Sequence, residues 1–320
     1  MNRIKYFNIV FRLVSPLAVG SGENANTDSD IILDSRGIPM IPATAIAGIF
    51  RHFLGMHGEN ELFGYIINNK SVESKIRFYD AKLISDNSFT TVRDSVKLQN
   101  KVGVKGAKFD MEAVESGVDF SAVIELNNAD DAENAILNAL SAIDTGFLRI
   151  GSKTSRGYGQ LRVVSLKRAD FTLPDDKTGW LNFDLFDAKD KYYTELALPQ
   201  NANNFINIKM KLKQNGAISI RSYTVKNPDD ISSADYIHLS LKDGTPVIPG
   251  TSWAGAFREH FRKLANDTDD SLTKEFFGYV DEKDKSQKKS LIYFSESYVN
   301  GEEMKLITRN SIDRFTAGTK

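Results

Sequence analysis

The chain has 320 residues, of which 41% are hydrophobic and 26% are charged. At roughly 100–200 residues per domain, this length predicts two domains, and the composition excludes a mainly disordered chain. Cysteine is absent, which excludes disulfide scaffolds, cysteine-ligated zinc and thiol catalysis. The 41 basic and 42 acidic residues give a formal net charge of −1, so any nucleic-acid site has to come from local clusters of cations.

The sequence gives no sign of membrane targeting. No apolar run reaches the roughly 18 residues that a membrane-spanning helix needs. The N-terminal apolar stretch is interrupted by Asn8 and Arg12, so we expect no signal peptide and no membrane partner. We therefore expect a cytoplasmic protein.

One sequence unit occurs twice in the chain. The segment GIPMIPATAIAGIFRHFLG begins at Gly37, and the similar segment GTPVIPGTSWAGAFREHFRKL begins at Gly244. The correspondence continues in the same order on both sides, with 7–13 matching 206–212 and 61–65 matching 275–279. This order predicts a duplicated domain. We call the two units the first repeat (1–168) and the second repeat (205–320), and we call residues 169–204 the connector.

The first repeat begins with a predicted strand and a predicted helix. Apolar side chains alternate with others over 7–13, which is typical of a strand with one buried face. Pro42 then opens a segment whose apolar residues are spaced three and four apart, which predicts a helix. Gly55 is placed to end that helix.

The remaining elements of the first repeat complete a known pattern. Strands are predicted at 75–83, 120–126 and 160–166. The apolar stripe of 132–143 predicts a second helix, with Asp130 and Glu133 as its N-terminal cap and Gly146 at its C-terminal end. The order β-α-β-β-α-β, with extra hairpins, predicts an α+β domain of the ferredoxin-like, split βαβ type.

The second repeat is predicted to be partial. It has a predicted strand at 206–212, a helix opened by Pro249 and a strand at 290–299. A second helix and a last strand have no counterpart before Lys320, so either the chain is a fragment or another polypeptide completes the domain. The connector contains Trp180 and other aromatic residues, so part of it should pack against a domain.

A glycine-rich segment precedes the last strand of the first repeat. It reads GFLRIGSKTSRGYGQLRV, and we call residues 151–159 the glycine loop. Glycine lets a backbone approach a phosphate closely, cations add attraction, and an aromatic ring stacks on a base. The candidate RNA-binding residues are Gly151, Lys153, Arg156, Gly157, Tyr158 and Gly159. The spacing does not match a nucleotide P-loop, and a simple turn between two elements is the alternative.

A second basic run, VRDSVKLQNKVGVKGAKF, extends over 92–109. It contains Arg93 and four lysines against the single acid Asp94. Such a run is expected either as a hairpin that grips a phosphate backbone or as a solvated lysine-rich loop.

These features together resemble the RAMP superfamily of CRISPR-associated proteins, and more closely the backbone subunits of type III effector complexes. The resemblance lies in GSKTSRGYG, in the start of the helix in both repeats, and in TRNSIDRFTAGTK at the end of the chain. The tandem arrangement resembles the type III-D style of effector. The resemblance implies a ribonucleoprotein of antiviral defence, with guide RNA, target RNA and other effector subunits as partners.

In this family the backbone subunits stack along a guide RNA. The resemblance implies that the glycine loop and the first helix hold the guide, and that a hairpin kinks the guide–target duplex. Where the family often has a lysine in the helix, this chain has Ala47 and Ala254. Guide contacts in the two helices therefore depend on two arginines, and the hairpins add a further aligned pair: Arg51 and Arg258, and Arg93 and Arg309.

The resemblance also implies endoribonuclease activity, because a loop aspartate of such subunits cuts the target RNA. Asp28 is the match in the first repeat, and Asp235 has the same spacing to the helix in the second. An acid there is expected to hold a divalent metal, Mg²⁺ or Mn²⁺, near the scissile phosphate, or to help deprotonate the 2′-hydroxyl. Asp30 is the main competitor for the first site. The alternative for both residues is an ordinary turn or strand cap.

Two other functions remain open at this point. One alternative is a scaffold that packs RNA without chemistry, and the other is a guide-processing endonuclease, an activity that commonly uses histidine in this superfamily. The four histidines form no convincing catalytic pair in the sequence: they are His52, His57, His238 and His260.

Overall fold

The structure is a computed structural model. It describes residues 2–20, 27–56, 60–67, 70–86, 88–99, 102–200, 205–223, 236–281, 285–301 and 305–307. Two expected site residues, Asp235 and Arg309, lie outside the described residues, as does His57. No helix of the described part is long and apolar enough to span a membrane.

The first repeat is built on one antiparallel sheet with the strand order β11-β10-β1-β9-β6-β2, and β5 also pairs with β9. The long central strand β1 lies between β9 and β10, with Phe7 opposite both Ile124 and Arg168. This is the predicted ferredoxin-like order. The strands are β1 (Asn2–Leu13), β2 (Met40–Ile41), β5 (Ile76–Phe78), β6 (Ala81–Leu83), β9 (Asp119–Asn127), β10 (Leu161–Leu173) and β11 (Thr194–Glu195).

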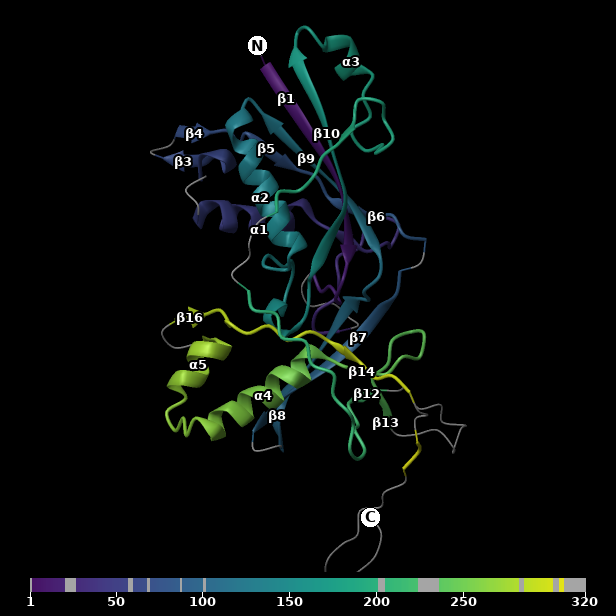
Figure 1. The fold of residues 1–320 in the computed structure, drawn as a ribbon, viewed down its shortest axis with the longest axis vertical. Coiled ribbons are helices and arrows are strands. Elements are labelled where there is room, and N and C mark those ends of the chain that lie inside the picture. Colours follow the sequence, from purple (N-terminus) through teal and green to yellow (C-terminus); the bar gives the residue numbers. More distant parts are fainter. Residues whose placement is uncertain are drawn as a thin grey trace, which may run out of the picture.

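Two helices cover one face of this sheet, as Figure 1 shows: α1 (Ala43–Met56) and α2 (Glu133–Asp144). The alternating residues Phe7, Ile9 and Phe11 of β1 are buried beneath them. Phe50 of α1 and Ile136 of α2 are buried in the same core. Burial of one apolar face of each element is what drives this packing.

The connector covers the opposite, outer face of the sheet. It contains the short helix α3 (Lys177–Leu181), and its Trp180 donates a hydrogen bond from Nε1 to the Tyr6 hydroxyl at 3.1 Å. The ring of Phe183 lies 5.2 Å from that of Tyr6 and 5.1 Å from that of Phe171. The predicted packing of the connector is thus observed. Strand β10 runs to Leu173, so residues 169–173 belong to the sheet and not to the linking segment.

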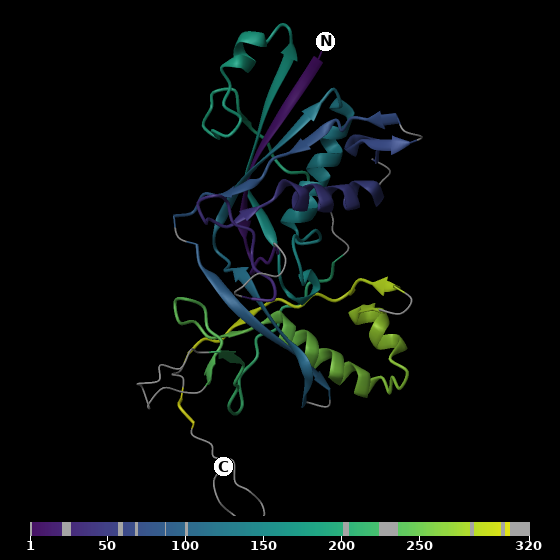
Figure 2. The same cartoon turned by 180° about the vertical axis from the view of Figure 1, so that it is seen from behind.

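A hairpin leaves the first repeat and runs alongside the second (Figure 2). It consists of β7 (Thr90–Gln99) and β8 (Val102–Val114). Smaller elements of the first repeat lie beside α1: they are η1 (Asn60–Phe63), β3 (Tyr65–Ile67) and β4 (Lys70–Val72). The basic run that the sequence singled out therefore forms an extended hairpin.

The second repeat reproduces the first around its helix. The ring of Phe50 lies 5.1 Å from Phe78, and the ring of Phe257 lies 5.2 Å from Phe294. This agreement supports the predicted duplication. The elements are β12 (Arg221–Tyr223), β13 (Tyr236–His238), β14 (Val247–Ile248), α4 (Gly250–Leu264), α5 (Ser271–Phe277), β15 (Tyr279–Val280), β16 (Gln287–Lys288) and β17 (Ser297–Tyr298).

The strand predicted at 206–212 does not form. Ile206 is 89% exposed and Ile208 is 78% exposed, and no strand is assigned between them. The equivalent strand β1 is hydrogen-bonded on both sides, by β9 and β10, whereas the described part of the second repeat has no counterpart of either. Without a neighbouring strand to pair with its backbone, the alternating segment forms no strand, and its apolar side chains stay exposed. Similarly, only Ser297–Tyr298 of the strand predicted at 290–299 is paired.

The predicted cap of α2 is also wrong in its chemistry. The N-cap position is Ala132, which has no side-chain hydrogen bond. Asp130 and Glu133 instead form ion pairs with the amino group of Lys5, at 2.8 Å and 2.5 Å. The Lys5 side chain is buried, so its positive charge needs a partner. Asp130 and Glu133 supply that partner and therefore do not cap the helix.

The two equivalent phenylalanines should differ in their effect on stability. Phe50→Ala removes a fully buried ring and should lower the free energy of unfolding by about 3–5 kcal/mol. Phe257→Ala removes a ring that is 40% exposed, so the loss should be less than half as large. Urea unfolding followed by circular dichroism measures both. Equal losses of stability would contradict the finding that Phe257 is much more exposed than Phe50.

Candidate functional site

The glycine loop lies at the junction between the two repeats. It contains the short helix η3 (Thr154–Arg156), followed by Gly157 with φ +93°. A Cβ atom at Gly157 would lie 2.4 Å from the carbonyl oxygen of Phe294, and one at Gly250 would lie 2.3 Å from that of Arg156. Both glycines are therefore needed for close backbone contact between the repeats.

The ends of the loop are fixed to the first repeat. The amide of Ser152 donates to the carbonyl oxygen of Ala18 at 2.9 Å, and that of Ile150 donates to Gly159 at 3.0 Å. A Cβ at Gly151 would lie 2.4 Å from the Ala18 oxygen. In this structure the three glycines of the loop accommodate carbonyl oxygens of the chain itself.

Two residues expected to contact RNA are buried. Tyr158 is 4% exposed and packs with Met111 and Ala113 of β8. Arg93 is 2% exposed, and its Nη1 lies 3.0 Å from Oε2 of Glu296 in the second repeat. Neither side chain has surface left for a nucleotide, so we correct the expectation and assign both to the junction.

The junction is electrostatically demanding. Burial raises the pKa of Glu296, and the positive charge of Arg93 opposes that rise. Burial likewise raises the pKa of Glu115, which accepts a hydrogen bond from the amide of Lys242 at 3.4 Å. Arg93 Nη2, Glu115 Oε1 and Glu296 Oε1 have no hydrogen-bond partner among the described residues. The Arg93–Glu296 ion pair is therefore almost completely enclosed by protein.

Some expected RNA-binding cations keep access to solvent. Arg156, Arg51 of α1 and Arg258 of α4 are exposed. Lys153 is half-buried, with Nζ 3.3 Å from the Ser95 hydroxyl and 4.5 Å from the centre of the Phe109 ring. Burial, with a smaller contribution from the charge of Arg156, lowers the pKa of Lys153 to about 8.

The loop that carries Asp28 is held on the hairpin. The amide of Asp28 donates to Oδ1 of Asp110 at 3.0 Å, and the amide of Asp110 donates to Oδ2 of Asp28 at 2.9 Å. Two residues after Asp110, Oε2 of Glu112 accepts a hydrogen bond from the amide of Ile31 at 3.2 Å. Reciprocal bonds of this kind fix the exposed Asp28 carboxylate relative to β8.

Asp30, the competing acid, lies differently. It is buried, and its carboxylate accepts a hydrogen bond from the hydroxyl of Thr27. A carboxylate in that position has a structural role in the turn, so Asp28 is the acid of this loop that faces solvent. The two acids are distinguished by their burial, which cannot be read from the sequence.

The residues around Asp28 fit a divalent metal only in part. Asp28 and Asp110 bring two carboxylates together, and oxygen ligands of this kind suit Mg²⁺ and Mn²⁺. In the described part of the chain, no group of three or more acidic or histidine side chains is arranged to hold a metal ion. A metal here would need further oxygen ligands from RNA phosphate or water.

Among the described residues, which do not include His57, the histidines do not form an acid–base site. His52 and His260 are exposed on different helices. Nδ1 of His238 accepts a hydrogen bond from the amide of Ile220 at 3.1 Å, and its Nε2 lies 3.2 Å from the carbonyl oxygen of Val247. His238 therefore joins strands of the second repeat, and the structure does not support histidine-based RNA processing.

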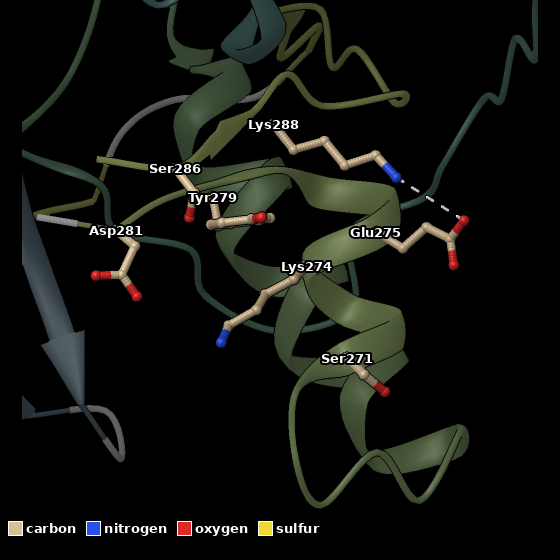
Figure 3. Close-up of a pocket in the computed structure, with 7 residues that line it drawn as sticks. All are labelled: Ser271, Lys274, Glu275, Tyr279, Asp281, Ser286 and Lys288. Carbon is tan, nitrogen blue, oxygen red and sulfur yellow. Dashed lines mark ion pairs between the residues drawn. The ribbon is translucent and has the colours of Figure 1, made fainter. Parts of the chain in front are cut away.

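A shallow pocket of about 540 Å³ lies between α5 and the β15–β16 hairpin (Figure 3). Glu275 and Lys288 on its border form an ion pair at 3.9 Å. None of its residues belongs to the glycine loop or to the Asp28 loop, so we do not include it in the RNA site. Its lining residues are Ser271, Lys274, Glu275, Tyr279, Asp281, Ser286 and Lys288.

The fold and the junction define a class of protein in which one ferredoxin-like unit packs against a partial second copy in a single chain. Residues 10–162 and 228–320, more than half of the chain, match the model of the RAMP superfamily, and the chain belongs to this superfamily. A comparison with curated proteins finds no match.

One similar solved structure is the "Cryo-EM structure of the Type III-B Cmr-beta bound to cognate target RNA". It matches with 18% sequence identity and a TM-score of 0.43, over 52% of this chain and 61% of that chain. The chain therefore spans about three fifths of the length of its counterpart in that complex.

The junction predicts a different outcome for two glycines with similar backbone angles. Gly157→Ala places a methyl group against the Phe294 oxygen, so the repeats should separate. Gly117→Ala, at φ +96° with no atom within 4 Å of the added Cβ, is the matched control and introduces backbone strain alone. Limited proteolysis should cleave the Gly157→Ala protein faster between the repeats. Equal cleavage of both variants would rule out the contact.

Proposed function

We propose that this chain is a guide-RNA-binding backbone subunit of a type III CRISPR effector and that its loop aspartates cut the target RNA. One observation carries the proposal: an exposed acid, Asp28, is fixed to the hairpin of a RAMP repeat, and that hairpin continues onto the next repeat. Its partners are then guide RNA, target RNA and other effector subunits in the cytoplasm.

The guide contacts come from the cations that remain exposed. Arg51 and Arg258 occupy the same turn of equivalent helices, so an RNA strand that passes both repeats meets a cation at each. Arg156 and Lys153 add positive charge between them, at the junction. Attraction of this kind acts on phosphates and does not depend on base sequence, as a subunit that accepts many guides requires.

Cleavage depends on the placement of one carboxylate. The amide of Asp110 holds Oδ2 of Asp28, which orients the Asp28 side chain toward solvent. Asp28 then takes the proton of the 2′-hydroxyl, whose oxygen attacks the adjacent phosphorus while the P–O5′ bond breaks and the leaving 5′-oxygen takes a proton from water. Asp28 and Asp110 would together hold a divalent ion. Such an ion, when bound, stabilises the negative charge that develops on the phosphate. Asp235 takes the same part in the second repeat.

A scaffold without chemistry is the second candidate. The observation that favours it is that only two carboxylates meet at Asp28, with no third acidic or histidine ligand among the described residues. In that case the exposed cations bind RNA as above, and cutting belongs to a neighbouring subunit.

Substitution of the aspartates separates the two candidates. Asp28→Asn keeps an oxygen that accepts the Asp110 amide hydrogen bond but removes the charge, so one of the two cuts in the target should slow by about a hundredfold or more. Asp235→Asn should suppress the other cut. Denaturing gels of labelled target incubated with the assembled complex and Mg²⁺ or Mn²⁺ report both.

The control for general charge effects is Asp187→Asn in the connector, which should leave both cuts unchanged. Target binding by the double variant should stay at the level of the natural protein. A double variant that cuts normally would eliminate the aspartate mechanism and leave the scaffold.

The lowered pKa of Lys153 makes RNA binding dependent on pH. Phosphate near Nζ favours the charged form, so binding should weaken as the pH rises through about 8, where free Lys153 loses its proton. Between about pH 7 and about pH 9, the affinity of the natural protein should fall by up to tenfold more than that of Lys153→Arg, which stays charged. Filter binding of single-stranded RNA measures this. Parallel pH profiles would show that Lys153 does not contact RNA.

A further inference from the structure

Residues 294–298 of the second repeat form part of its contact with the first repeat, alongside Gly250 and Lys242. The oxygen of Phe294 meets Gly157, and Glu296 pairs with Arg93. The hydroxyl of Tyr298 lies 3.5 Å from that of Ser116, which follows β8. This stretch thus forms a contact surface for a preceding repeat.

Hydrogen bonds identify the equivalent stretch in the first repeat. The Ser74 hydroxyl donates to the carbonyl oxygen of Ile76 at 2.6 Å, and the Ser290 hydroxyl donates to that of Ile292 at 2.8 Å. Counting on from this pair, residues 78–82 correspond to 294–298. The strand pairings agree, because Lys82 lies opposite Met40 as Tyr298 lies opposite Val247, its equivalent.

In the first repeat this stretch meets the connector. The ring of Phe186 lies 5.6 Å from that of Tyr79 at an interplanar angle of 90°, and Nζ of Lys82 lies 4.6 Å from the centre of the same ring. Lys82 is the counterpart of Tyr298. Lys82 thus contacts a connector aromatic where its counterpart, Tyr298, contacts a preceding repeat.

The connector is anchored, not merely resting on this surface. Its Phe183 packs between Tyr6 and Phe171, and its Trp180 hydrogen-bonds to Tyr6. The Tyr193 hydroxyl donates to the carbonyl oxygen of Leu185 at 2.7 Å, which fixes the segment that leads to Phe186. Figure 1 shows this layer on the side of the sheet opposite α1 and α2.

The start of the helix gives a second, independent observation. Gly250 admits the Arg156 oxygen because it has no Cβ, whereas the equivalent residue of the first repeat is Ala43. The amide of Ala43 also donates to Oδ1 of Asp80 at 2.7 Å. A glycine loop could not approach α1 as closely as it approaches α4.

We propose that the connector closes the first repeat to a preceding RAMP unit, so that a row of repeats on a guide RNA begins at this chain's first repeat. The inference rests on the proposed function, since a row exists only in an assembled effector. The inference also gives the row a direction, because further backbone units can then join only beyond the second repeat.

The test uses the absence of cysteine from the chain. Asp187→Cys places a single thiol beside Phe186, and Lys177→Cys places one on α3, farther along the connector; both positions are exposed. Each variant is labelled with a maleimide dye, first alone and then in the complex purified from cells. Both should react in the complex at a rate within about threefold of the rate in the free chain.

A larger slowing confined to Asp187→Cys would overturn the proposal, because another molecule would then cover the Lys82 face. Nuclease treatment of the sample tells whether RNA or a subunit covers it, and either result counts against closure. The RNA extracted from the same complex tests the proposed function separately. A complex without guide RNA defeats that function, whereas a guide-containing complex with a blocked Asp187→Cys defeats only the closed end.

Discussion

The buried ion pair of Arg93 and Glu296 is the interaction on which the arrangement of the two repeats depends. Two charges inside protein each lose several kcal/mol of hydration, and removal of one partner of such a pair costs about 3–5 kcal/mol. The pair therefore holds strand β7 against the second repeat at one position. Its neighbour β8 carries Asp110, opposite Asp94 on β7, and Asp110 holds Asp28. The placement of the candidate catalytic acid thus follows from a contact outside the site.

The glycine loop shows how a residue pattern can serve two kinds of contact. A glycine without Cβ admits any oxygen atom that comes close, and a carbonyl oxygen of the protein is as suitable as a phosphate oxygen. Here Gly157 admits the oxygen of Phe294, and Gly151 admits that of Ala18. The cations of the same loop differ in their surroundings: Arg156 faces solvent, whereas Lys153 lies against the hairpin. The backbone of the loop joins the repeats, and the side chain of Arg156 remains exposed.

Local patterns were enough to predict the duplication, the sheet of the first repeat and its helices, because alternation and helical spacing act over neighbouring residues. Partners distant in the sequence were not predictable in this way. Arg93 was expected to contact RNA because it lies in a basic run and aligns with Arg309. Its partner Glu296 lies 203 residues away in the other repeat, where no local pattern points to it. The segment from Ile206 to Leu212 has the alternation of β1 but no neighbouring strands, so it forms none. Asp28 was the predicted acid and Asp30 its main competitor. The burial of Asp30 distinguishes the two, and the role of Asp235 stays a prediction.

The two repeats also differ where their equivalent acids, Asp80 and Glu296, act. Asp80 in the first repeat turns back and accepts a hydrogen bond from the start of its own helix, at Ala43. Glu296, one methylene longer, reaches Arg93 of the other repeat, and Gly250 leaves space for the approach. A duplicated unit presents the same face twice, and two identical faces would each accept a neighbour. In the first repeat, Asp80 bonds within its own unit and the methyl group of Ala43 prevents close approach. In the second repeat, Glu296 and Gly250 allow the contact with a neighbouring repeat. In the proposed row of backbone units, such a difference would give the row a direction.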